Sequence, residues 1–327
     1  MYEEGSSQEI YTLGQSDQNV SSGVSARREN MDDVSSRMKS DISEYTLTAA
    51  GMDEVALPIQ MDLPEIGSQT LFAKARITVN TVDGSIKGIH MSRLFLSVTE
   101  KFESKTFSSE LLEDVLMACK DSHEGISDRT DLKLSFALPM KRPSLKSGLA
   151  GWRLYPVTIT ASVDDKNQFT YKVNLNIKYA SFCPCSASLA RQLIQEKFLA
   201  DFGGETTQST AEISEWLRKA SSIAAVPHGQ RSTATVSFDT KKLDGELLSS
   251  TVALLEDAIK TPVQTAVKRQ DEQEFARLCA ENLIFVEDAV KIFYKAIKTK
   301  TSYTKVKVDV AHHESLHAHD AVASISD

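Results

Sequence analysis

The sequence predicts an α+β protein in which helices cover one face of antiparallel sheet, arranged as a tandem repeat. Three observations support this class. Segments with apolar and polar residues in alternation occur in both halves of the chain, and each half also contains amphipathic helical segments. Tight-turn residues such as Asp83 and Gly84 separate alternating segments. Each half therefore reads as a hairpin, a helical segment and a second hairpin.

Residues 1–50 are predicted to form a disordered polar tail. From Ser6 to Ser43 the chain is rich in Ser, Asp, Asn, Gln and Glu, with only scattered hydrophobic residues. Such a composition buries too little apolar area to offset the entropy lost on ordering. We expect the ordered part of the chain to begin near "VALPIQMDLPEIG", an extended segment that contains two prolines.

The first module is assigned to residues 51–165. We expect "TLFAKARITVNT" and "IKGIHMSRLFLSV" to form a hairpin around the turn "VDGS". The segment "SSELLEDVLMACKD" has its apolar residues on one helical face, and Ser108 or Ser109 is suited to cap it. Two alternating segments follow as strands, "TDLKLSFALPM" and "WRLYPVTITASVD", and a third, "QFTYKVNLNIKYASF", lies at the start of the second module.

The second module is assigned to residues 166–327. It contains a strand at "QRSTATVSFDT", helical stretches over 245–260 and 271–298, and strands at "YTKVKVDVAHH" and "DAVASIS". A helical insertion at about residues 186–224 interrupts this module.

Composition limits the classes of binding partner and the cellular compartment that we expect for this protein. The net charge of −8 argues against a broad nucleic-acid surface, although a basic pocket for a small phosphorylated molecule remains compatible with it. No apolar run approaches the roughly 18 to 20 residues of a membrane span, and the N-terminus lacks the layout of a signal peptide. We therefore expect a cytoplasmic protein that binds neither membranes nor nucleic acid.

Cysteine placement indicates a chemical site. Of the four cysteines, Cys183 and Cys185 flank a proline at the end of a predicted strand. His228 and Arg231 stand at the start of the next strand, beyond the insertion, so these groups meet if the two strands pair. Each signal is weak alone, because the cysteine spacing is shorter than structural zinc sites use and His228 is compatible with an ordinary turn.

Further polar residues accompany these two segments. Lys268, Arg269 and Glu272 lie at a helix start, and Glu287 lies in an apolar helix where a buried carboxylate would need a donor partner. "HHESLHAHD" contains Glu314, His317 and His319 at a strand end, within a segment that holds four of the seven histidines. His90 and Arg93 belong to "GIHMSRL", which we expect to be a strand.

Six motifs together resemble GTP cyclohydrolase IB, the prokaryotic metal-dependent enzyme that opens folate biosynthesis. They are "GIHMSRL", "SFCPCS", "HGQRS", "VKRQDEQEF", "NLIFVEDAV" and "HESLHAHDAV". The resemblance runs from about Leu57 to the C-terminus. It implies a tunnelling fold of two ββααββ modules, which assembles as a homotetramer with barrels and with active sites at subunit interfaces. The polar tail and the helical insertion depart from the shorter members of the family.

The resemblance also implies the role of each site residue. The metal ligands would be a cysteine of "CPC", His228 and Glu272, and we favour Cys183 over Cys185. Glu287 would anchor guanine, and Glu314, His317 and His319 would carry protons. Substrate binding would also use Arg231, Lys268, Arg269, His90 and Arg93. One divalent ion, zinc, manganese or iron, would activate water to attack C8 of GTP, giving formate and 7,8-dihydroneopterin triphosphate.

Two other functions remain open on the sequence alone. The NADPH-dependent nitrile reductase of queuosine biosynthesis shares the implied fold, a cysteine and a glutamate, but its thiol is a covalent nucleophile and it needs no metal. His228 together with Glu272 would be superfluous in such an enzyme. The other alternative is a non-enzymatic interaction protein with a structural zinc held by the two cysteines and two C-terminal histidines. Metal removal would unfold that protein but leave a cyclohydrolase folded and inactive.

Overall fold

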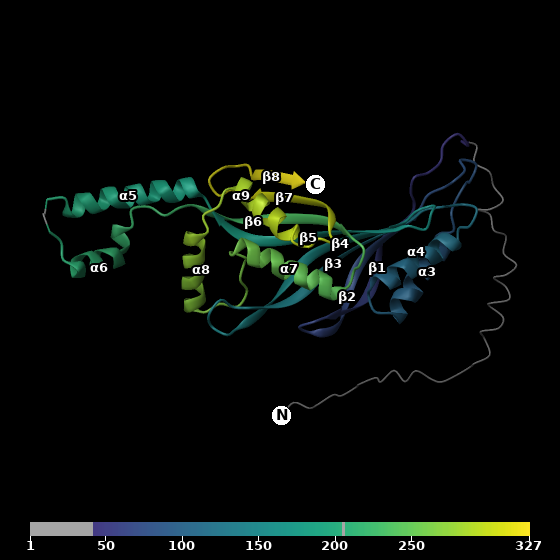
Figure 1. Ribbon diagram of the computed structural model, residues 1–327, viewed down its shortest axis with the longest axis horizontal. Helices are drawn as coiled ribbons and strands as arrows, with labels where there is room; N and C mark the ends of the chain where they lie inside the picture. Colours follow the sequence, from purple (N-terminus) through teal and green to yellow (C-terminus); the bar gives the residue numbers. More distant parts are fainter. Residues whose placement is uncertain (1–41, 205–206) are drawn as a thin grey trace, which may run out of the picture.

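The computed structural model describes residues 42–204 and 207–327, so most of the predicted tail lies outside the described residues. Its centre is one eight-stranded sheet, antiparallel throughout, whose strands follow chain order (Figure 1). The α+β class with antiparallel sheet is confirmed. The strands are β1 (Ala50–Leu63), β2 (Gly67–Val79), β3 (Thr130–Pro143), β4 (Ala150–Val163), β5 (Phe169–Phe182), β6 (Gly229–Thr240), β7 (Thr304–His312) and β8 (Ala321–Ser326).

The first hairpin differs from the prediction. It is formed by β1 and β2 around residues 63–67, so the expected lead-in is itself a strand. The expected second strand is helix α3 (Met91–Ser104), whose buried residues recur every four positions: Leu94, Val98 and Phe102. Residues 89–92 alternate in polarity, but the longer helical period decides the structure because it allows one face to pack on β1. Helix α4 (Ser109–Asp121) forms as predicted, and the Ser108 side chain accepts the backbone N–H of Leu111.

The remaining helices of the body also pack on the sheet. They are α7 (Gly245–Ile259), α8 (Arg269–Glu281) and α9 (Val286–Ile297), so the helical stretch predicted over 271–298 is two helices. Helix α7 packs on β1 and β5, and α9 packs on β7 and β8. Alternate strand residues such as Leu175, Ile177 and Tyr179 are buried on this side of the sheet. On the other side, polar side chains pair across strands, as where Thr235 donates to Asn176 at 2.7 Å.

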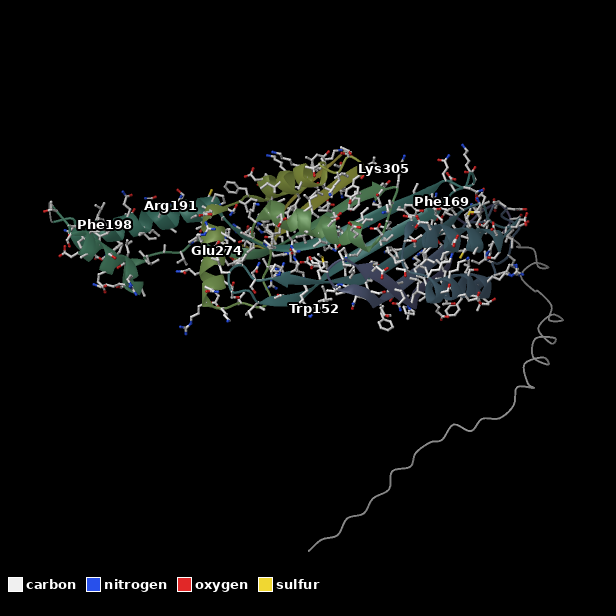
Figure 2. All side chains as sticks on the ribbon, turned by 60° about the horizontal axis from the view of Figure 1, so that its bottom comes forward. Trp152, Phe169, Arg191, Phe198, Glu274 and Lys305 are labelled. Carbon is white, nitrogen blue, oxygen red and sulfur yellow. The ribbon has the colours of Figure 1, made fainter. Side chains whose placement is uncertain are left out.

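The insertion extends away from the sheet. It contains α5 (Pro184–Phe202), α6 (Thr210–Arg218) and the short 3-10 helix η1 (Ala220–Ser222), and it projects beyond α8 at one end of the molecule (Figure 1). Phe198 lies toward its tip (Figure 2), with its ring centroid 5.2 Å from that of Trp216. None of the helices in the described residues is long and apolar enough to cross a membrane.

The order of elements is similar in the two halves of the chain. Residues 50–163 run strand, strand, helix, helix, strand, strand. Residues 169–326 begin and end with two strands and have α7, α8 and α9 between them, with the insertion separating β5 from β6. Because all eight strands belong to one sheet, the division into two modules at residue 165 stays a prediction.

Candidate active site

One cavity collects six of the residues that the sequence singled out. Its volume is about 610 Å³, and it lies where β5 ends and α5 begins. Three segments that are distant in sequence form it: the start of α5, the residues before β6, and the loop between β7 and β8. The six residues are Cys183, Cys185, His228, Glu314, His317 and His319.

Strand pairing brings Cys183 and His228 to the same place. The sequence brings these groups together on the condition that the two strands pair. β5 does pair with β6, with Phe182 opposite Gly229, so the residues just beyond each partner are neighbours. The Cys183 backbone N–H donates to the His228 carbonyl at 3.4 Å, and the His228 N–H donates to Ser186 Oγ at 3.0 Å. Pro184 suits the first turn of α5, and Cys183 is the N-cap residue. Its thiol makes no capping bond, which leaves it available to the cavity.

A hydrogen-bonded group surrounds the His228 ring. Nδ1 lies 3.3 Å from Gln230 Oε1 and 3.8 Å from Glu314 Oε2. The Gln230 amide donates through Nε2 to Glu314 Oε1 at 3.3 Å. Glu314 Oε2 is buried and has no hydrogen-bond partner among the described residues. A carboxylate oxygen thus remains free to accept a proton or a hydrogen bond beside the imidazole.

The loop between β7 and β8 is held at its base by His313. Its Nδ1 lies 2.7 Å from Asp320 Oδ2, and its Nε2 lies 3.0 Å from Thr233 Oγ1. These contacts close the loop across its two ends. Farther along the loop, the exposed rings of His317 and His319 stack with centroids 5.1 Å apart.

Helix α8 carries three predicted site residues away from this cavity. Glu272 is exposed in the first turn, and Lys268 and Arg269 lie exposed at the helix start. Asp271 fixes this end, because its carboxylate accepts the backbone N–H groups of Lys146 and Lys268, both at 2.7 Å. None of these residues lines the cavity. Accordingly, no group of three His, Cys, Asp or Glu side chains able to hold a metal occurs within residues 42–204 and 207–327.

Glu287 is exposed, so the expectation that it is buried was wrong. It lies in the first turn of α9, off the helix face that packs on the sheet, which consists of Val286, Ala289, Val290 and Phe293. Its charge nevertheless acts on His312, a buried residue whose Nε2 lies 2.8 Å from Tyr179 Oη. Burial lowers the pKa of His312 to about 4, and the charge of Glu287 opposes this shift.

Arg231, His90 and Arg93 also lie outside the cavity. Arg231 is exposed on β6, on the opposite side of the strand from buried Gln230. His90 is the N-cap residue of α3 and its backbone N–H donates to Nε2 of His123 at 3.1 Å. Arg93 Nη1 donates to the carbonyl of Ser122 at 3.1 Å. Helices α3 and α4 lie at the end of the molecule opposite to α5 (Figure 1).

Two polar residues at the site and a set of apolar residues that line the cavity, called here the apolar wall, were not predicted from the sequence. Gln230 was detectable, because it lies two residues after His228 and side chains two apart share one face of a strand. Ser186 contacts His228 only through the turn into α5, which no pattern in the sequence indicates. The wall consists of Leu189, Leu193, Val226 and Leu316, all exposed.

Comparison with known proteins places the chain in one family. The model of the family described as "Type I GTP cyclohydrolase folE2" matches residues 31–323. The GTP cyclohydrolase FolE2 of Pseudoalteromonas translucida is 44% identical over 282 residues, covering 85% of this chain and 91% of the relative. That of Hydrogenovibrio crunogenus is 40% identical over 282 residues, with 86% and 89% covered.

Two solved structures also match most of the chain, at low sequence identity. Uricase from Arthrobacter globiformis gives a TM-score of 0.46 at 7% identity, covering 86% of this chain and 94% of that one. A hyperthermostable mutant of urate oxidase from Bacillus sp. TB-90 gives 0.47 at 7% identity, covering 86% and 98%.

Proposed function

The chain belongs to the family of type I GTP cyclohydrolases described as folE2, and we infer that it is a GTP cyclohydrolase of folate biosynthesis. The reaction opens the imidazole ring of guanine in GTP, releases formate and gives 7,8-dihydroneopterin triphosphate. We place it in the cavity beside Cys183 and His228. The observation that carries this assignment is the convergence of six predicted residues from three segments in one cavity.

We further propose that the protein is a type IB enzyme. It would have the tunnelling fold with two modules and would assemble as a homotetramer. Two features support a site shared between subunits. In the described part of the chain, alternate residues of β3, β4 and β5 are exposed or half-buried, which leaves this face of the sheet available to a second copy. Glu272, Glu287, His90 and Arg93 all lie outside the cavity of their own chain, so they reach a substrate there only if another subunit supplies them.

One divalent cation, zinc, manganese or iron, is proposed for each site. Cys183 and His228 suit it, because the thiol makes no capping bond and both residues line one cavity. Glu272 would complete the set from a neighbouring subunit, since the described residues bring no third ligand to these two. When bound, the cation supplies the Lewis acidity that lets water attack C8 near neutral pH.

The chain's own residues would handle protons and substrate. Glu314 accepts protons through its free Oε2 atom, and His317 and His319 pass them on, because an imidazole ring can both donate and accept a proton. Glu287 accepts from N1–H and the 2-amino group of guanine, a donor pair that adenine lacks. Binding of the triphosphate falls to cationic side chains. These are Arg231, Lys268, Arg269 and Arg93, and His90 is proposed as a further substrate-binding residue.

The decisive experiment is incubation of the metal-loaded protein with GTP while formate and pterin fluorescence are measured. ATP serves as the control substrate, because it lacks the donors that Glu287 would accept. We expect both products from GTP and neither from ATP. Absence of formate with zinc, manganese and iron alike would overturn the assignment. Metal content of Cys183→Ser and Cys185→Ser, measured separately, identifies the ligand, which we expect to be Cys183.

A further inference from the structure

Gln230 lies between two of the proposed site residues, and no role has so far been attached to it. It belongs to β6 and is buried, with 9% of its surface exposed. Its Oε1 is 3.3 Å from His228 Nδ1, and its Nε2 donates to Glu314 Oε1 at 3.3 Å. One amide therefore joins the imidazole to the carboxylate.

The chemistry of these groups allows only one direction for the amide. A carboxylate accepts hydrogen bonds and cannot donate, so the NH₂ group of Gln230 must face Glu314. Turning the amide around would set its oxygen against the carboxylate oxygen, which is repulsive. The bonding partners of the amide thus determine its orientation.

The direction of the amide then decides where His228 holds its proton. Because Gln230 presents its carbonyl oxygen, Nδ1 of His228 must be the donor. A neutral imidazole has one N–H, so Nε2 is left with its lone pair. A metal-binding histidine needs a free lone pair of this kind, and its other nitrogen commonly donates to an acceptor nearby.

The backbone of His228 is fixed independently of its ring. Its N–H donates to Ser186 Oγ at 3.0 Å, and its carbonyl accepts from the Cys183 N–H at 3.4 Å. Both contacts tie it to the start of α5, so Gln230 has only the ring to orient. Gln230 itself is carried by a central strand of the sheet, paired with β5 and β7, which makes it a rigid support.

We propose that Gln230 is a positioning residue, which transmits the acceptor character of Glu314 to His228 and so leaves Nε2 free to bind a divalent cation. The proposal rests on the proposed function, because it requires His228 to be a metal ligand. Loss of an outer partner of this kind costs about 10- to 100-fold in metal affinity.

The test begins with Gln230→Met, which keeps the length of the side chain and removes both hydrogen bonds. Gln192→Met is the matched control, because Gln192 also donates to a glutamate, Glu196 at 3.0 Å, but on the exposed face of α5. We expect the Kd for cobalt(II) to rise about 10- to 100-fold in Gln230→Met and to stay unchanged in the control. An unchanged Kd in Gln230→Met would overturn the proposal.

A double variant separates positioning from packing. Gln230→Glu alone places a carboxylate against Glu314 and should weaken metal binding. Adding Glu314→Gln restores a donor and acceptor pair in which the acceptor still faces His228. We expect the double variant to bind cobalt(II) within about threefold of the original protein. If both variants bind equally weakly, Gln230 is needed for its shape alone and the proposal fails.

The third measurement reads the ring directly in the metal-free protein. Nitrogen-15 shifts from solid-state spectra of histidine-labelled protein, assigned with His228→Ala, should show the proton on Nδ1 of His228. In Gln230→Met we expect a mixture of the two neutral forms, and a signal unchanged from the original protein would contradict the proposal. Normal metal binding by His228→Ala would instead overturn the proposed function, so the two failures are distinguishable.

Discussion

Arg153 on β4 donates to the buried carboxylate of Glu256 on α7, with 2.6 Å between Nη1 and Oε1. Tyr155 donates to the same oxygen at 2.6 Å, and Arg142 Nη2 lies 2.8 Å from Oε2. Glu256 is 2% exposed, so two hydrogen-bond donors and one further cation, Arg142, surround one desolvated anion. This contact joins a strand of the first half of the chain to a helix of the second.

Glu256→Ala should destabilise the protein strongly, because it leaves Arg153 and Arg142 partly buried without their anion. We expect the free energy of unfolding to fall by about 3 to 5 kcal/mol, measured by urea denaturation. Glu54→Ala is the control, since Glu54 pairs with Lys74 on the surface, where ion pairs contribute little. Equal losses in the two variants would show that the buried network does not stabilise the fold.

Acid should destabilise the protein through His312. Its folded pKa of about 4 lies below the ordinary histidine value because the residue is buried. Between these values the unfolded chain binds the proton and the folded chain does not. Stability is therefore complete above about pH 6.5 and is lost as the pH falls toward 4.

The stability lost on acidification follows from the lowered pKa of His312 and amounts to roughly 3 kcal/mol. The measurement is urea denaturation of the metal-free protein between pH 4 and 7, compared with His312→Gln. The variant should lose this part of the pH dependence, whereas His319→Gln, at an exposed position, should keep it. Identical pH profiles for His312→Gln and the original protein would contradict the prediction.

His228→Ala should lose most bound metal and essentially all turnover while remaining folded. The ring lies at a cavity, and the backbone contacts of residue 228 to Ser186 and Cys183 do not need the side chain. Metal content by atomic emission, formate release and circular dichroism test the three parts. Arg191→Ala, exposed on α5, is the control. A variant that is free of metal yet fully active would contradict the metal assignment.

Measurements of metal content and GTP affinity should distinguish the roles proposed for Glu287 and Glu272. Glu287→Gln should weaken GTP binding by roughly 1.5 to 3 kcal/mol, the usual contribution of a charge-assisted hydrogen bond, with metal content unchanged. Glu272→Gln should lose metal first. Both residues are exposed in the single chain, so we expect little change in unfolding. If Glu287→Gln is the variant that loses metal, the two roles are exchanged.

Deletion of residues 1–45 should leave turnover within about threefold and the oligomeric state unchanged, because the composition of this segment provides no core. Deletion of residues 1–49 is the comparison. It also removes Leu47, whose N–H donates to Thr81 Oγ1 at 2.8 Å and whose carbonyl accepts the Thr81 N–H at 2.9 Å. We expect only the longer deletion to lower thermal stability. A change of oligomeric state in the shorter deletion would show that the segment is structural.

Local patterns determined most of the elements. Alternation placed β2 to β8 and helical spacing placed α4 and α7, because buried faces repeat every two residues in a strand and every 3.6 in a helix. The pattern was ambiguous at "GIHMSRL", where a short alternation overlaps a longer helical period. Packing against β1 resolved it in favour of α3, so His90 and Arg93 lie at a helix start instead of along a strand.

The sequence by itself placed Cys183 at the end of one predicted strand and His228 at the start of the next, so that they would meet if the two strands paired. The structure showed that pairing. Only the tertiary structure decided that Glu314 and Gln230 join His228, that Glu272 stays outside this cavity, and that Glu287 is exposed. The physical reason is one of range. Backbone periodicity acts between neighbours in the chain, whereas the side chains that share a cavity are chosen by strand register and by packing between distant segments.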